Sequence, residues 1–142
     1  MSEGKDRFEV RLTSDSHFAW VRTRMAMERT LMAWVRTATA LIGFGFTIVQ
    51  FFQRLESTTG VAPAHHPEAA RYMGLALIGA GVASLAISAW QYRRLSEYMW
   101  GPPFTPLAGF DHGKTTTPLL AVAFGLMLIG IFAFFAVLLR IV

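Results

Sequence analysis

Four arginines near the start of the sequence are the residues whose type and spacing best fit a defined chemistry. Arg22, Arg29 and Arg36 are seven residues apart, and Arg24 lies beside the first of them. In a helix this spacing puts the three side chains in one stripe, which drifts by only about 20° per step. A guanidinium group pairs with phosphate oxygens through two parallel hydrogen bonds. The stripe therefore predicts binding of phosphate-bearing anions or of lipid headgroups.

A second basic pair, Arg93 and Arg94, follows the next apolar block. The aromatic residues around it are Trp90, Tyr92, Tyr98 and Trp100. Aromatic rings beside basic anchors are typical of the interface between a membrane and water. This pair is the second predicted site for an anion or a headgroup.

Glu28 has two interpretations. It is either a gate or proton-handling carboxylate next to Arg29, or the partner of Arg24 four residues earlier. We expect the ion pair, because an unpaired carboxylate near lipid is costly and residues four apart on a helix are neighbours.

No pattern in the sequence indicates catalysis or metal binding. His65 and His66, with Glu68, are too few ligands for a closed metal site, and an exposed polar loop is the expected setting. Gly43 and Gly45 lie within an apolar block with no strand before them, so helix packing rather than a phosphate loop explains them. The absence of Cys excludes disulfides and thiol chemistry. We expect no enzyme, no cofactor and no bound metal.

The composition requires a membrane environment. Of 142 residues, 54% are hydrophobic and 15% are charged, and the net charge is +4. A soluble chain of this length has too small a core to hide so much apolar surface. Basic residues beside apolar blocks indicate contact with anionic lipid and argue against a nucleic-acid partner.

Three apolar blocks predict an all-α fold with three transmembrane helices. The expected spans are residues 33–52, 72–92 and 118–139, each close to the length that crosses a bilayer. An amphipathic helix, starting at one of the N-cap residue types in 13–16, leads into the first span and is either continuous with it or kinked. Residues 1–15 are predicted to be a polar cytoplasmic tail, and 16–142 the membrane domain.

Small residues in the second span predict close contact with another helix. They recur every four residues, at Ala76, Ala80, Ser84 and Ser88.

The distribution of Lys and Arg predicts the orientation. Nine lie before the first span or between the second and third spans, namely Lys5, Arg7, Arg11, Arg22, Arg24, Arg29, Arg93, Arg94 and Lys114. Three lie on the other side, namely Arg54, Arg71 and Arg140. Because positive charge accumulates on the cytoplasmic side, we expect a cytoplasmic N-terminus and a periplasmic or extracellular C-terminus.

One local pattern resembles a known family. Residues 26–46 read A-x-E-R-T-L-x-A-W-x-R-T-x-x-A-L-I-x-F-G-F, which is similar to the YidH-like family of small three-span bacterial inner-membrane proteins, a domain of unknown function. The residues that carry the motif are Glu28, Arg29, Thr30, Trp34, Arg36 and Thr37. Met27 and Met32 depart from the family, which usually carries Asn and Leu at these positions. The resemblance implies a multi-pass protein of the bacterial inner membrane.

The same domain is similar to the membrane part of the eukaryotic vacuolar transporter chaperone complex. There, several copies surround a polyphosphate-conducting pore lined by basic side chains. The resemblance implies that Arg22 and Arg29 line such a pore, with Arg93 or Arg94 as the contribution of the second span. The sequence holds no companion catalytic domain, so polyphosphate synthesis is not implied.

Three functions are compatible with these features. The first is a structural or accessory membrane protein that forms homo-oligomers. The second is an oligomeric channel or transport component for anions such as phosphate or polyphosphate, with the arginines as its lining. The third is a scaffold that binds anionic lipid headgroups. Anchoring of the arginines on headgroups is the simplest interpretation of the stripe.

Overall fold

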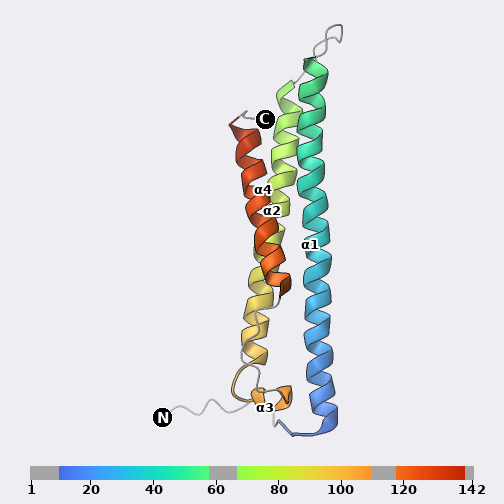
Figure 1. Ribbon diagram of the computed structural model, residues 1–142, viewed down its shortest axis with the longest axis vertical. Helices are drawn as coiled ribbons and strands as arrows, with labels where there is room; N and C mark the ends of the chain where they lie inside the picture. Colours follow the sequence, from blue (N-terminus) through green and yellow to red (C-terminus); the bar gives the residue numbers. More distant parts are fainter. Residues whose placement is uncertain (1–9, 58–66, 110–117, 140–142) are drawn as a thin grey trace.

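The computed structural model describes residues 10–57, 67–109 and 118–139, and these residues form four helices (Figure 1). The helices are α1 (Ser14–Glu56), α2 (Pro67–Met99), α3 (Thr105–Ala108) and α4 (Pro118–Leu138). No strand occurs in the described part of the chain. Three helices, α1, α2 and α4, are long and apolar enough to cross a membrane. The predicted all-α fold with three spans is confirmed, and the chain is a multi-pass membrane protein.

Several predictions concern residues outside the described ranges. They are most of the polar tail, the pair His65 and His66, and the residues Lys5, Arg7, Lys114 and Arg140 of the orientation count.

The entry helix and the first span form one continuous helix, α1. It begins where the sequence predicts, because the Thr13 hydroxyl accepts a hydrogen bond of 3.2 Å from the backbone N–H of Ser16. Its 43 residues correspond to about 65 Å, roughly twice the thickness of the hydrocarbon core. The helix therefore extends well beyond the membrane.

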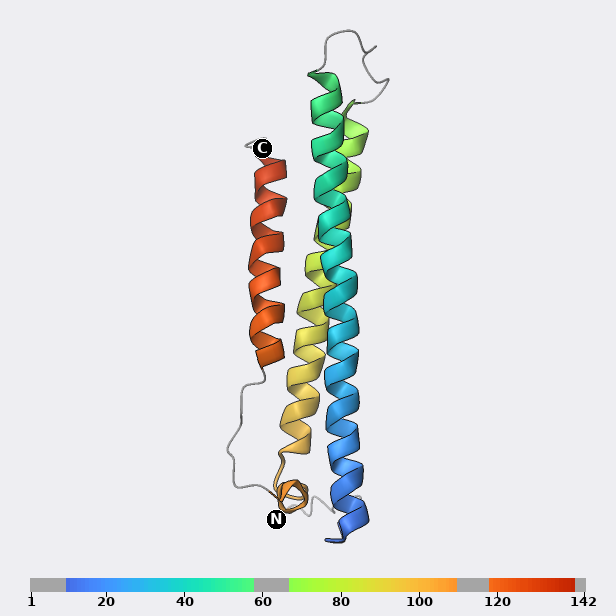
Figure 2. The ribbon, with the colours of Figure 1, turned by 45° about the vertical axis from the view of Figure 1, so that its right-hand side comes forward.

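Glycines bring α1 and α2 into close contact along an antiparallel seam (Figure 2). A Cβ atom built on Gly45 would lie 2.7 Å from the carbonyl oxygen of Gly74, and one on Gly81 would lie 3.0 Å from that of Ala38. Neither place has room for a side chain. Small residues of this kind let membrane helices approach closely and pack by van der Waals contact.

The predicted ridge of small residues in α2 is largely not used within the protomer. Ala76 and Ala80 are exposed, whereas Gly74 and Gly81 face α1. Ser88, from the same ridge, is buried. Gly43 also differs from expectation, because a Cβ atom on it would meet nothing within 4 Å. The contact with α1 follows the glycines, and a second small-residue face of α2 remains uncovered.

The third span packs through small residues, of which Gly130 meets both other helices. A Cβ atom on Gly130 would lie 2.6 Å from Val82 of α2 and 2.8 Å from Ile42 of α1. The hydrophobic core of the three spans consists of Ala38, Ile42, Val49, Leu75, Ile78, Leu85, Ala123 and Val137. At the far end of the bundle, Arg71 Nη2 donates a hydrogen bond of 2.6 Å to the carbonyl oxygen of Leu138.

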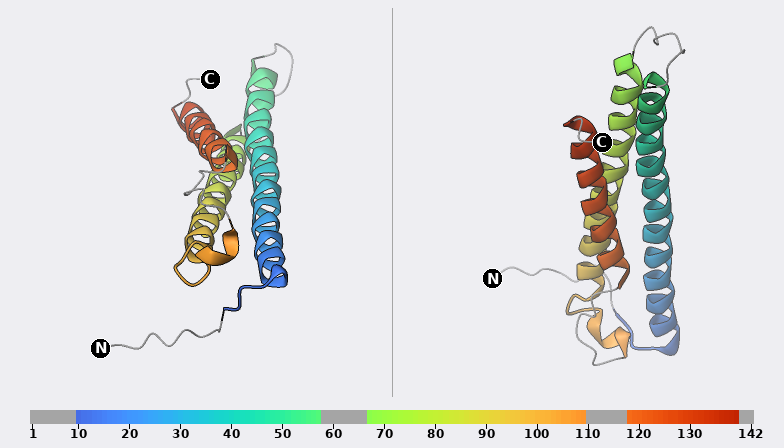
Figure 3. Two further views of the ribbon diagram at one scale, coloured as in Figure 1. Left: turned by 60° about the horizontal axis from the view of Figure 1, so that its bottom comes forward. Right: turned by 45° about the horizontal axis from the view of Figure 1, so that its top comes forward.

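We infer that the start of α4 marks one edge of the membrane. Because α2 and α4 are antiparallel and Val82 meets Gly130, twelve residues along each helix bring Arg94 level with Pro118. The 21 residues of α4 span about 31 Å, which matches the hydrocarbon core. Beyond this edge α1 and α2 continue as a helix pair, and α3 lies against their ends (Figure 3). We call this the α3 end of the bundle.

The seam makes a prediction about two neighbouring glycines. Gly45→Ala places a methyl group against backbone and should lower the free energy of unfolding by about 1–3 kcal/mol, the usual cost of overpacking. Gly43→Ala, on the uncovered side of α1, should instead raise it by about 0.5–1 kcal/mol, because alanine restricts the unfolded chain. Unfolding by sodium dodecyl sulfate in mixed micelles measures both. Equal effects of the two substitutions would contradict the seam.

Candidate functional site

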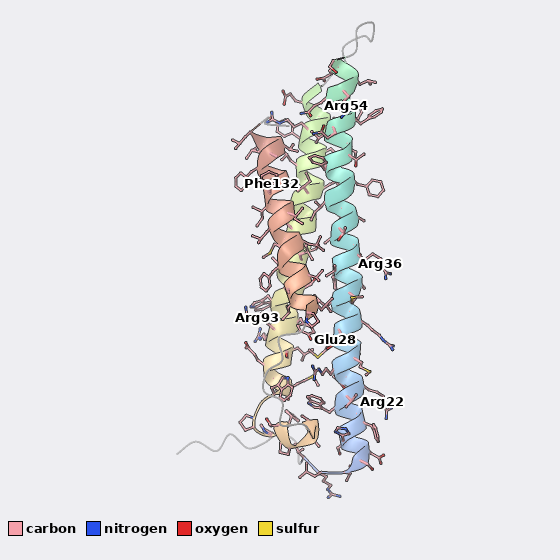
Figure 4. The ribbon with its side chains drawn as sticks, viewed as in Figure 1. Arg22, Glu28, Arg36, Arg54, Arg93 and Phe132 are labelled. Atoms are coloured by element: carbon pink, nitrogen blue, oxygen red, sulfur yellow. The ribbon has the colours of Figure 1, made fainter. Side chains whose placement is uncertain are left out.

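The arginine stripe lies on the face of α1 that points away from the rest of the bundle. The buried residues of α1 are Trp20, Leu31, Ala38, Ile42, Gly45 and Val49. At 100° per residue, Arg22, Arg29 and Arg36 lie about half a turn from that face. All three are exposed, and Arg22 and Arg36 project away from α2 and α4 (Figure 4). We call this surface the outer face of α1.

The three stripe arginines make no hydrogen bond or ion pair with another described residue. Arg24 differs, because its Nε lies 3.7 Å from Glu28 Oε1. The predicted Arg24–Glu28 pair is confirmed. Both side chains are about a third exposed, so the pair contributes little to stability, on the order of 0.5 kcal/mol. The stripe itself is left with three positive charges that have no counter-ion from these parts of the chain.

The stripe crosses the edge of the membrane. Gly81 lies against Ala38 and Ile42, so the depth of Arg94 corresponds to residues 25–29 of α1. Arg29 is therefore at the edge, Arg22 about 10 Å outside it and Arg36 about 10 Å inside. Helical side chains tilt toward the N-terminus, so the Arg36 side chain leans back toward the headgroups.

Alanines alternate with the arginines on the outer face of α1. Ala26, Ala33 and Ala40 each follow an arginine by four residues, and Gly43 follows Arg36 by seven. The seven-residue spacing of the alanines is present in the sequence, but only the position of the buried face shows that Ala33 and Ala40 point outward with the arginines, whereas Ala26 lines a groove between α1 and α2. Exposed Met25 and Met32 lie on the same face, so its small residues leave room for another helix mainly from Ala33 to Gly43.

The threonines of the family motif are occupied by their own helix. The hydroxyl groups of Thr30 and Thr37 donate to the carbonyl oxygens of Ala26 and Ala33, at 2.9 and 3.1 Å. Both hydroxyl groups therefore donate their hydrogen bonds to the backbone of α1 itself. Trp34 is 45% exposed.

Trp34 and Thr30 line a groove of about 260 Å³ between α1 and α2. Its other residues include Ser88, Gln91 and Tyr92 of α2. The motif thus contributes one wall of a shallow, mostly apolar surface.

An aromatic cluster at the α3 end surrounds Arg24. Its guanidinium carbon lies 5.9 Å from the ring centroids of both Trp20 and Trp100. The Trp20 indole N–H donates a 3.3 Å hydrogen bond to the carbonyl oxygen of Met99. Cation–π attraction and this buried bond tie the start of α1 to the end of α2. Sequence reasoning missed the cluster, because 79 residues separate Trp20 from Met99.

His17 fixes α3 to α1. Its Nδ1 lies 2.6 Å from the carbonyl oxygen of Leu107, and its ring lies 3.3 Å from the place of a Cβ atom on Gly109. Gly109 has a left-handed φ of 66°, which a side chain would strain. The α3 end is therefore a packed structure rather than a loose connection.

The second predicted basic site belongs to a different part of the surface. Arg93 and Arg94 are exposed on α2 at the edge of the membrane, and Arg93 lies on the side of the bundle opposite Arg22 (Figure 4). Both arginines line a groove of about 390 Å³ between α2 and α4. Within one protomer, the five predicted arginines thus form two separate groups. Among the described residues, no group of three or more His, Asp or Glu side chains is placed to hold a metal ion.

Comparison with known proteins gives one match. The family model described as "Domain of unknown function (DUF202)" matches residues 22–98, more than half of the 142 residues. The matched segment contains all five arginines of the two basic groups and ends before α4. The match is consistent with the YidH-like family. No curated protein and no solved structure matches the chain.

The aromatic cluster makes a prediction about two tryptophans of α1. Trp20→Phe removes the hydrogen bond to Met99 and should speed amide hydrogen exchange in residues 99–108 by about fivefold, since one such bond contributes about 1 kcal/mol. Trp34→Phe, at a half-exposed position on the same helix, should leave these amides unchanged. Mass-spectrometric exchange on the whole protein in micelles compares the two. Unchanged exchange in Trp20→Phe would show that the cluster does not hold α3.

Proposed function

The chain belongs to the family described as a domain of unknown function (DUF202), and on that premise we propose that it is an accessory protein of the bacterial inner membrane that assembles into homo-oligomers. The contact between copies joins the outer face of α1 in one copy to the uncovered small-residue face of α2 in the next. One observation carries the proposal: both faces are exposed within the protomer and lie at the same depth.

The depth match follows from contacts inside one protomer. Gly45 meets Gly74 and Ile78, and Gly81 meets Ala38 and Ile42, so residue numbers of α1 and α2 at equal depth add to about 119–123. Ala40 is therefore level with Ala80 of α2. Copies that share one orientation in a membrane keep this relation. Small residues then oppose small residues, which is what close packing of membrane helices requires.

Charge opposes this contact less than one between two identical faces, because it brings one pair of arginines level, Arg29 of one copy and Arg94 of the next. Pairing two outer faces of α1 would oppose arginines of like charge, which is unfavourable near lipid. The proposed contact instead places Arg36 level with Ser84 of the neighbour, whose hydroxyl can accept a hydrogen bond. Because the two joined faces differ, the contact is heterologous and closes into a ring when the rotation between copies allows it.

Disulfide trapping tests the assembly. Because the sequence contains no Cys, every disulfide that forms joins introduced cysteines. Ala40→Cys combined with Ala80→Cys should give, on oxidation in membranes, a ladder of covalent oligomers on a non-reducing gel. A bond within one protomer is excluded, because Ala40 faces away from α2 and a disulfide needs Cα atoms within about 7 Å.

The matched control moves one cysteine to α4. Phe132→Cys lies at the same depth as Ala80 and is 74% exposed, so paired with Ala80→Cys it should give monomer only. Monomer from the Ala40/Ala80 variant, or equal ladders from both variants, would contradict the proposed contact.

A second candidate function is an anion pathway lined by the stripe. The observation that favours it is the lack of a partner for Arg22, Arg29 and Arg36 among the described residues. Rings of arginine favour anions and phosphates in pores, and the resemblance to the vacuolar transporter chaperone membrane domain agrees with that use. In this reading, copies assemble so that successive stripes face a shared axis.

Phosphate efflux from proteoliposomes tests the pathway. The unmodified protein should release trapped phosphate faster than protein-free vesicles, and Arg22→Ala combined with Arg29→Ala should reduce the release to the protein-free rate. Arg22→Lys with Arg29→Lys keeps the charge and should retain most of the flux. Unchanged flux in the alanine variant would exclude the stripe as the lining.

A further inference from the structure

We propose that the groove between α2 and α4 at the α3 end binds one anionic phospholipid, with the lipid phosphate on Arg93 and Arg94 and an acyl chain along the groove. The groove lies within one protomer, so this site does not depend on the oligomer or on the anion pathway proposed above.

The lining of the groove changes from apolar to charged along its length. Its floor is formed by Ala86 and Ala89 of α2 and by Phe124 and Met127 of α4. Its mouth is formed by Trp90, Arg93, Arg94 and Glu97, and the volume is about 390 Å³. An apolar trough that opens onto charged groups fits an amphipathic ligand rather than a soluble anion.

The depth of the charged mouth matches that of a lipid headgroup. Arg94 is level with Pro118, the first residue of α4, as the contact of Gly130 with Val82 requires. Phe124 and Met127 lie two to three turns deeper along α4. A phospholipid in the surrounding leaflet would meet both parts of the groove in its ordinary position, so binding requires no displacement from the bilayer.

The charge of the mouth complements an anionic headgroup. Two guanidinium groups and one carboxylate give a net charge of +1, and neither arginine forms an ion pair with Glu97 in the structure. The Arg94 guanidinium carbon lies 5.4 Å from the Trp90 ring centroid, which holds this side chain beside the groove. Arg93 and Arg94 are thus free to make the charge-assisted hydrogen bonds that a phosphate accepts. Basic pockets between transmembrane helices are established binding places for anionic lipid headgroups.

Quenching of Trp90 fluorescence by brominated lipids tests the site. The full-length protein is reconstituted in phosphatidylcholine vesicles that contain increasing fractions of dibrominated phosphatidylglycerol or dibrominated phosphatidylcholine. The Trp90 signal is the difference between the unmodified protein and Trp90→Phe. We expect phosphatidylglycerol to associate about fivefold more strongly than phosphatidylcholine, the effect of about one net charge at the surface.

Paired charge variants separate this site from general surface attraction. Arg93→Gln with Arg94→Gln leaves only the Glu97 charge at the mouth and should bring the preference for phosphatidylglycerol below one. Arg22→Gln with Arg29→Gln removes the same charge from the opposite side and should leave the preference unchanged. Equal loss in both variants, or no preference in the unmodified protein, would overturn the proposal.

Two further arms test the groove and the class of ligand. Ala86→Leu fills the exposed floor while keeping both arginines, and should weaken quenching by phosphatidylglycerol. Millimolar glycerol 3-phosphate should not displace the brominated lipid. Unchanged quenching in Ala86→Leu, displacement by the soluble phosphate, or stronger quenching by dibrominated phosphatidylethanolamine would each contradict binding of an anionic phospholipid in the groove.

Discussion

The close approach of α1 and α2 at Gly45 and Gly74 is the constraint on which the rest of the structure depends. Neither position leaves room for a Cβ atom, so an approach as close as this one requires glycine at both positions. Once that face of α1 is buried, the heptad spacing of Arg22, Arg29 and Arg36 places all three on the opposite side. The packing of small residues therefore decides which way the three arginine side chains point, and their charge contributes little to this orientation.

The charged groups concentrate at one end because lipid tolerates them only where they reach water or headgroups. α1 and α2 continue beyond the start of α4, and the Trp20–Met99 and His17–Leu107 contacts hold this extension together. The extension presents two basic surfaces, one on the outer face of α1 and one at the groove between α2 and α4. These surfaces suit different occupants. The first carries small residues beside its arginines and suits another helix or a shared anion, whereas the second is hollow and suits a lipid chain with its phosphate.

The fold could be predicted from the sequence because long apolar blocks, Pro118 and the N-cap at Thr13 are local signals. By contrast, local signals could not predict which small residues of α2 contact α1. Ala76 and Ala80 form as regular a series as Gly74 and Gly81, and only the missing Cβ atoms decide which series meets α1. The same applies to the site. Heptad spacing predicted one stripe from Arg22 to Arg36, but no sequence signal shows that Arg93 and Arg94 lie on another side of the bundle. His17 and Leu107 are 90 residues apart, so their contact could not be predicted from spacing in the sequence.

α1 packs through one face, and its stripe arginines occupy the other. Oxygen accessibility of nitroxide labels along residues 31–44, in nanodiscs that hold a single copy, tests this most directly, with position 38 left unlabelled because it lies against Gly81. We predict an oscillation with the helical period, with minima at positions 31 and 42 and maxima at 33, 40 and 43. The reverse pattern, with minima at 33, 40 and 43, would place the arginine stripe inside the bundle and contradict the account.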